Sequence, residues 1–144
     1  MTATNWEVET LTGRPYWEEK ATRDTVALCD DVLKLVHTFA PDCVFNFEKK
    51  HDIGFIVNGP QINFAICKPI KKSFKLGIKQ PESDLFESKL IKAGLKKQGV
   101  NRYEGWLYVP SKELYYIHLT KYDIEKYSVF LTKILRAAYN KTIN

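Results

Sequence analysis

The spacing of apolar residues predicts three helices in this chain. Apolar side chains that recur every three or four positions form one face of a helix. Three segments follow this period: residues 17–38, residues 82–97, and a segment from Thr120 or Asp123 to about residue 140. Thr22 or Thr25 could cap the first of them, and Gly99 is the expected end of the second.

Between these helices, apolar and polar residues alternate with the period of a strand. Six strands are predicted, over residues 44–48, 53–57, 62–67, 74–78, 105–109 and 113–119. Asn58-Gly59-Pro60 is typical of a turn, so the second and third strands should form a hairpin. The alternation in residues 61–66 and 72–79 gives one apolar face and one polar or basic face, as in an antiparallel sheet covered on one side.

The order of these elements indicates the fold class. One helix is followed by four strands, a helix, two strands and a helix. Runs of strands beside segregated helices are typical of an α+β fold, here an antiparallel sheet of about five to six strands with helices packed on one face. The 144 residues suffice for one domain, which we expect over residues 17–144, after an N-terminal arm of residues 1–16.

The sequence favours a cytoplasmic protein with no membrane segment. No run of apolar residues is long enough to cross a bilayer, and the acidic N-terminus lacks the apolar stretch of a signal peptide. The chain has three cysteines, Cys29, Cys43 and Cys67. Their number is odd and no two form a CxxC pair, which fits a reducing compartment. Each lies in an apolar stretch, so we expect all three to be buried as small hydrophobic residues.

Charge is divided unevenly along the chain. Residues 1–48 have a net charge of −5, whereas residues 49–144 have a net charge of +10. The bases of the second part stand among aromatic and β-branched residues, so they belong to a folded surface. Such a surface favours polyanions, either nucleic acid or another anionic ligand.

The predicted anion-binding residues are the bases on and around the fourth strand and the second helix. They are Lys68, Lys71, Lys72, Lys75, Lys79, Lys89, Lys92, Lys96 and Arg102. Lys75 and Lys79 should share one face if their strand is regular. Because nearly all of these bases are lysines, contacts to nucleic acid should address the backbone with little sequence specificity. The alternative is a solvated lysine-rich face without a ligand.

Aromatic residues give a second candidate surface. Trp106 and Tyr108 lie on the same face of the fifth strand, where they either form a stacking platform for bases or cover the core. Asn46, Asn63 and Tyr103 could add polar contacts to a ligand on the sheet.

No pattern in the sequence predicts catalysis. His37, His51 and His118 lack metal-site spacing, so we predict no metal and no cofactor. The carboxylates do not cluster as a two-metal nuclease requires. Neither a GxSxG elbow nor a glycine-rich phosphate loop is present. No catalytic residue is therefore predicted, and a binding role is favoured over an enzyme.

Several short motifs, in this order, resemble the family catalogued as domain of unknown function 5655, whose members are sometimes labelled "predicted transport protein". They are Trp17 with Lys20, Asn63-Phe64-Ala65 with Lys68-Pro69, Lys75-Leu76-Gly77-Ile78, Tyr116 with His118-Leu119, Asp123-Ile124 and Ala137-Ala138-Tyr139. The resemblance spans roughly residues 17–140. Such domains are also similar to small YdhG-like α+β domains, one branch of which is linked to iron handling. Some relatives stand beside nuclease or restriction modules, which implies a setting in defence or DNA modification. The family implies no active-site residue.

Three functions remain open from the sequence. The leading hypothesis is a non-enzymatic binding module that engages nucleic acid or an anionic ligand. The second is a protein-interaction adaptor that docks a partner at a sheet edge or on the acidic first helix. The third is a small-molecule or metal-binding domain. The pattern gives no indication of an oligomeric state.

Overall fold

The α+β prediction is confirmed by a computed structural model, which describes residues 13–48, 51–59 and 61–143. Its centre is a six-stranded sheet in the order β1-β2-β3-β4-β6-β5, in which all neighbouring strands are antiparallel. The strands are β1 Val44–Asn46, β2 Ile53–Ile56, β3 Gln61–Pro69, β4 Phe74–Lys79, β5 Trp106–Val109 and β6 Leu114–His118. All six predicted strands are present, and β2 and β3 form the predicted hairpin, with Asn58 and Gly59 at positive φ in the turn.

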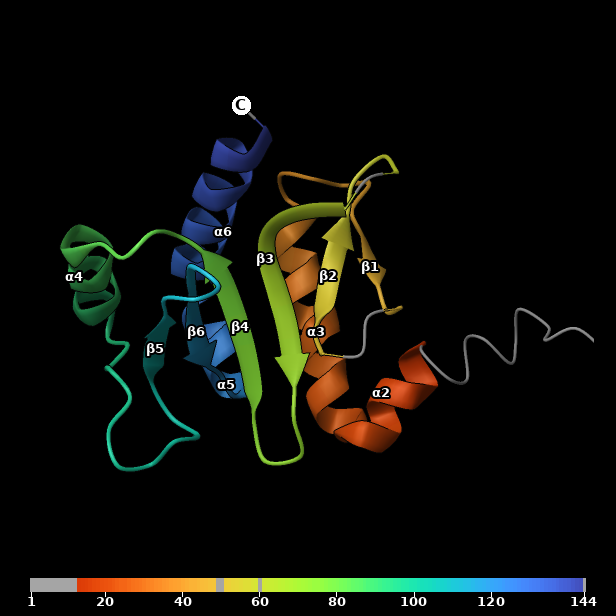
Figure 1. Ribbon diagram of the computed structural model, residues 1–144, viewed down its shortest axis with the longest axis horizontal. Helices are drawn as coiled ribbons and strands as arrows, with labels where there is room; N and C mark the ends of the chain where they lie inside the picture. The colour runs from red at the N-terminus through yellow and green to blue at the C-terminus, as the bar shows by residue number, and fades with distance from the viewer. Residues whose placement is uncertain (1–12, 49–50, 60, 144) are drawn as a thin grey trace, which may run out of the picture.

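The helices lie on one face of this sheet. They are α2 Arg14–Lys20, α3 Arg23–Val36, α4 Asp84–Ala93, α5 Lys121–Lys126 and α6 Ser128–Ile143. Helices α3 and α6 lie behind the strands, and α4 lies at the side near β5 (Figure 1). The opposite face, called here the open face, carries no helix among the described residues. Of these helices, none has both the length and the apolar character needed to cross a membrane.

The predicted first helix is two helices with a break at Ala21. Thr22 caps the second of them: its hydroxyl accepts a hydrogen bond from the Thr25 backbone amide at 3.0 Å, and the Thr25 hydroxyl accepts one from the Thr22 amide at 3.2 Å. This reciprocal pair starts a new helix. Residues 1–12 of the predicted arm lie outside the described residues, and residues 14–16 belong to α2 and are not extended.

The ends of the other helices also differ from the prediction. Helix α4 ends at Gly94, whose φ of 105° favours glycine, so the predicted end at Gly99 was wrong. The last predicted helix is divided at Tyr127 into α5 and α6. Thr120 caps α5 by accepting a hydrogen bond from the Asp123 backbone amide.

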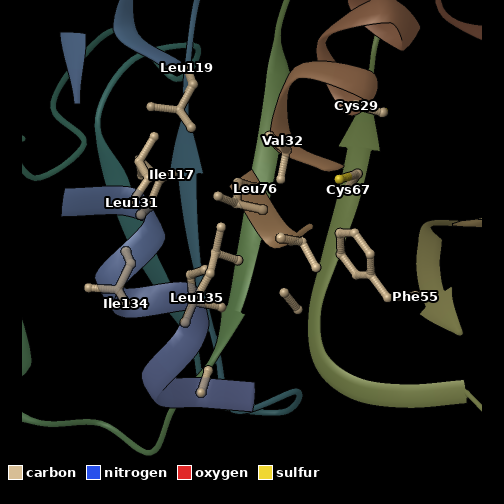
Figure 2. Close-up of a cluster of buried hydrophobic side chains, with 14 of the residues drawn as sticks. Cys29, Val32, Phe55, Cys67, Leu76, Ile117, Leu119, Leu131, Ile134 and Leu135 are labelled. Carbon is tan, nitrogen blue, oxygen red and sulfur yellow. The ribbon is translucent and has the colours of Figure 1, made fainter. Parts of the chain in front are cut away.

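The core lies between the sheet and helices α3 and α6 (Figure 2). Val32 of α3 and Leu131 and Leu135 of α6 pack there with Leu76 of β4 and Ile117 of β6.

The prediction that the three cysteines are buried is confirmed, and none forms a disulfide. Burial raises the pKa of Cys67 well above its usual range, and a contact with Cys29 raises this pKa further. These thiols therefore act as packing groups.

Helix α4 is fixed to the helix-facing side of β6 by Tyr115. The Tyr115 hydroxyl donates a hydrogen bond to Glu87 at 2.7 Å and accepts one from the Ser83 amide at 2.9 Å. Its ring lies 4.8 Å from the ring of Phe86. The bases of α4 are thus carried on the side of the sheet opposite the open face.

The side chains of β3 do not alternate regularly between the two faces of the sheet along the whole strand. Regular alternation would put Ile62, Phe64, Ile66 and Lys68 on the same face. In the structure Phe64 lies in the main core, whereas Ile66 packs with Leu114 and Tyr116 in a separate cluster on the open face. The pairing register between β2 and β3 shifts at this point. This irregularity turns Lys68 from the core side to the open face.

The outer edge of β5 is covered by the chain segment that precedes it. The Trp106 amide donates a hydrogen bond to the Lys96 carbonyl at 2.9 Å, and the Gln98 amide donates one to the Trp106 carbonyl at 2.8 Å. Gly105, at a φ of 84°, permits this close approach, because a Cβ there would lie 2.7 Å from the Lys96 carbonyl oxygen.

Candidate anion-binding site

A row of basic side chains crosses the open face. Lys68 of β3 lies directly opposite Lys75 of β4, and Lys75 lies directly opposite His118 of β6. Side chains in such opposed positions have their Cβ atoms about 5 Å apart. The fold therefore gathers three basic groups on neighbouring strands, and they are called here the cationic row.

The cationic row lies in a concave pocket of about 490 Å³. Its lining is Lys68, Ile70, Lys75, Gln98, Arg102, Tyr103, Leu107, Val109, Lys112, Tyr116 and His118. None of these side chains is acidic. Among the described residues, no carboxylate lies within ion-pair distance of Lys68, Lys75 or Lys112. The pocket is an electropositive hollow with aliphatic and aromatic surfaces in its wall.

Tyr116 lies beneath two of these ammonium groups. Its ring centre is 4.7 Å from Lys75 Nζ and 6.0 Å from Lys112 Nζ, within the range of cation–π attraction. Gly77 leaves space for the ring, since a Cβ at that position would lie 3.2 Å from Tyr116 Cε1 and 2.8 Å from Ile66 Cγ1. The missing side chain of Gly77 thus permits the tyrosine to cover the sheet here.

The Tyr116 hydroxyl is buried without a hydrogen-bond partner in the part of the chain that the structure describes. The residue is only 5% exposed. Burial raises the pKa of Tyr116 to about 12, so the hydroxyl keeps its proton at neutral pH. A buried hydroxyl without a partner costs about 1–3 kcal/mol. This group is a hydrogen-bond donor that lacks an acceptor.

The lysines of the cationic row are held in an unfavourable environment for a positive charge. Burial lowers the pKa of Lys75, and Lys68 and Lys112 lower it further. Burial also lowers the pKa of Lys68, with Lys112 adding to the effect and Asp52 opposing it. An anion among these groups would remove the repulsion and favour their charged forms.

His118 completes the row as a neutral group. Its Nδ1 lies 2.6 Å from the Ser73 hydroxyl oxygen, and this hydrogen bond fixes the ring. Burial lowers the pKa of His118, and the Lys75 charge lowers it further. No described carboxylate hydrogen-bonds to the imidazole, so the serine and histidine lack the orienting acid of a catalytic triad.

The predicted basic residues do not form one continuous surface. Lys68, Lys75 and Arg102 line the pocket, and Lys72 stands at its side, with Nζ 5.7 Å from the Tyr103 ring centre. Lys79 shares the face of Lys75, as predicted, but pairs with Glu113 at 3.5 Å. The other four are exposed outside the pocket, with Lys71 in the β3–β4 turn and Lys89, Lys92 and Lys96 on or after α4.

The aromatic candidates Trp106 and Tyr108 face the other side of the sheet. They lie opposite Ile117 and Tyr115, which belong to the main core. Trp106 is 2% exposed, and its Nε1 donates a hydrogen bond to the Leu95 carbonyl. Of the two roles left open by the sequence for Trp106 and Tyr108, the structure supports the core role.

The three polar residues considered as ligand contacts do not lie together. Tyr103 lines the pocket. Asn46 and Asn63 do not: they are joined through the Gln61 amide, at 2.6 Å and 2.7 Å, outside the pocket lining.

Lys112, Tyr116 and His118 were missed as site residues by sequence reasoning. The signal for Tyr116 and His118 is that they stand two positions apart on β6 and therefore share a face. The alternation along β6 does not show which of its faces is open. Which face lies beside Lys75 depends on the register between β4 and β6.

Within the described ranges, no group of three or more His, Cys, Asp and Glu side chains is placed to hold a metal ion. The resemblance to the domain of unknown function 5655 family stays a prediction. Comparison with protein-family models, with curated proteins and with solved structures finds no match to this chain.

Proposed function

We propose that this domain is a non-enzymatic binding module that holds nucleic acid by its phosphates on the open face of the sheet. The observation that carries the proposal is the opposed pair Lys68 and Lys75, with His118 beside it, in which neither lysine forms an ion pair with a described carboxylate. Like charges in directly opposed positions destabilise a sheet. A phosphate among them would turn this repulsion into attraction.

The chemistry of the pocket favours contacts to phosphate over contacts to bases. Its ammonium groups, on Lys68, Lys75 and Lys112, act as point charges without the planar fork that reads guanine. Arg102 is the arginine of the lining, and it stands at the exposed rim. Binding should therefore release counterions, weaken steeply with salt and depend little on sequence.

A paired set of charge reversals tests this proposal. One variant carries Lys68→Glu and Lys75→Glu in the pocket, and its control carries Lys89→Glu and Lys92→Glu on the exposed face of α4. Both change the net charge equally. Fluorescence anisotropy with labelled single- and double-stranded oligonucleotides, from low to physiological salt, gives the affinities. We expect the pocket variant to lose at least about tenfold in affinity and the control to lose much less.

Two results would count against the proposal. One is the absence of binding to any oligonucleotide at low salt. The other is an equal loss in both variants, which would assign binding to net charge alone. A setting in defence or DNA modification rests on the family resemblance and is a separate proposal.

The adaptor hypothesis has less support from the geometry. On α3, Asp30 pairs with Arg14 at 2.7 Å and Asp31 pairs with Lys121 at 3.5 Å, so part of the acidic surface is neutralised within the chain. For the third hypothesis, a metal or small-molecule domain, the basic charge of this pocket disfavours a metal cation.

A further inference from the structure

We infer that the pocket selects a terminal phosphate monoester of a single nucleic-acid strand over the internal phosphodiesters. This inference rests on the proposed function and narrows its ligand. Three features of the pocket support it: the convergence of its charges, an unused hydrogen-bond donor, and an apolar wall beside the charges.

The charges of the pocket gather around the opposed pair Lys68 and Lys75. Proteins that bind single strands along the backbone use a basic groove that continues over several nucleotides. Here Lys68 and Lys75 are directly opposed, and Lys112 and Arg102 line the same pocket. Beyond the pocket the next base on β4, Lys79, is already paired with Glu113. A diester brings one negative charge to this point, whereas a monoester brings about −1.5 to −2 at neutral pH.

The pocket also offers more donors than a diester uses. A monoester has three terminal oxygens that accept hydrogen bonds, compared with two on a diester. Tyr116, whose ring lies beneath the ammonium groups of Lys75 and Lys112, contributes a buried, protonated hydroxyl that has no acceptor among the described residues. An additional phosphate oxygen is the acceptor that this group lacks.

The wall of the pocket has room for the nucleoside attached to the phosphate. Ile70, Leu107 and Val109 provide aliphatic surface, and Leu107 is 40% exposed. The Tyr103 ring stands at the rim between Lys72 and Arg102, where a base could stack on it. These surfaces distinguish a nucleotide end from free inorganic phosphate.

One oligonucleotide in three forms tests the inference: with a 5′-phosphate, with a 3′-phosphate, and with hydroxyls at both ends. Affinities are measured by anisotropy with a label placed internally. We expect at least one phosphorylated form to bind about tenfold more tightly than the hydroxyl form, the effect of an added charge-assisted hydrogen bond. The two phosphorylated forms show which end is selected. A nucleoside monophosphate should compete better than inorganic phosphate.

A single-atom change links the preference to this pocket. Tyr116→Phe keeps the ring and removes the hydroxyl, so it should reduce the ratio between the affinities for the phosphorylated and the hydroxyl forms. Tyr108→Phe, on the opposite face, is the matched control and should leave this ratio unchanged. Thermal unfolding of both variants establishes that each is folded.

The outcomes separate this inference from the proposed function. Equal affinity for all three forms would overturn the inference and leave the proposed function standing. No binding to any form would overturn both. A preference that persists in a Lys68→Gln, Lys75→Gln variant would place the selection outside this pocket and also overturn the inference.

Discussion

Lys68 and Lys75 face each other across β3 and β4 as a like-charge pair on the open face of the sheet. Both side chains are partly buried. Burial lowers the pKa of each lysine, and neighbouring lysines lower it further. If stability were the only requirement, a carboxylate or a neutral residue at either position would make the sheet more stable. The pair therefore lowers the stability of the ligand-free sheet, which supports the proposal that an anion binds here.

Removing one charge of the pair should stabilise the ligand-free domain. Lys68→Gln relieves the repulsion from Lys75 and Lys112, and we expect the free energy of unfolding to rise by about 0.2–1 kcal/mol at low salt. Salt screens the repulsion, so the gain should shrink as ionic strength rises. Urea denaturation of both proteins at two salt concentrations measures the difference.

Lys71→Gln is the control for this substitution, because Lys71 is exposed in the β3–β4 turn, outside the pocket. Its stability should stay close to that of the wild type. A loss of stability in Lys68→Gln, or an equal gain in both variants, would contradict the electrostatic explanation.

The lowered pKa of His118 makes stability depend on pH in a defined direction. Burial and Lys75 hold this pKa below the ordinary value of 6.5 in the folded protein. The unfolded chain then binds more protons than the folded chain, so stability falls as the pH drops from about 6.5 through the folded pKa. In His118→Gln this part of the pH dependence should disappear. Chemical denaturation at several pH values from about 8 to about 5 measures the slope.

His51→Gln provides the comparison, because His51 is exposed and does not line the pocket. A His118→Gln slope identical to that of the wild type would show that other groups cause the acid sensitivity. A bound phosphate should reduce the slope, since an adjacent anion favours the imidazolium form.

Gly77 should be required for the floor of the pocket. In Gly77→Ala the new Cβ would collide with Ile66 Cγ1 at 2.8 Å and press on the Tyr116 ring at 3.2 Å. We expect a loss of about 1–3 kcal/mol in the free energy of unfolding, as for other overpacked sites. Anion binding should weaken as well, because the ring lies under Lys75 and Lys112.

Gly99 is a matched control in the same chain. A Cβ at Gly99 meets nothing within 4 Å. Gly99→Ala should therefore leave stability unchanged or raise it by up to about 1 kcal/mol. Equal losses in the two variants would indicate that glycine-to-alanine changes act here through the backbone and not through Tyr116.

The sheet could be predicted from the sequence because its signals are local. Asn58 and Gly59 take the positive φ values that their turn motif implies, and the hairpin follows. Lys75 and Lys79 share a face because β4 is regular. The helix breaks were missed because buried apolar residues stand on both sides of them: Trp17 and Val26 flank Thr22, and Ile124 and Leu131 flank Tyr127.

The site could be predicted only in part because it depends on register between strands. Lys68 reaches Lys75 through the irregularity in β3, which reverses the alternation read from residues 61–66. His118 reaches Lys75 through the pairing of β4 with β6, two strands separated by α4 and β5 in the chain. The composition shows that lysines are numerous, but only the folded structure shows which of them line the pocket.

The segment that covers β5 has a consequence for the behaviour of the domain at high concentration. A bare outermost strand offers its amides and carbonyls to another molecule and can start aggregation through intermolecular β-sheet growth. In this domain the hydrogen bonds of Trp106 to Lys96 and Gln98 occupy that position within the same molecule. The opposite border, β1, is only three residues long. Both borders therefore protect the sheet against uncontrolled extension while its open face stays accessible.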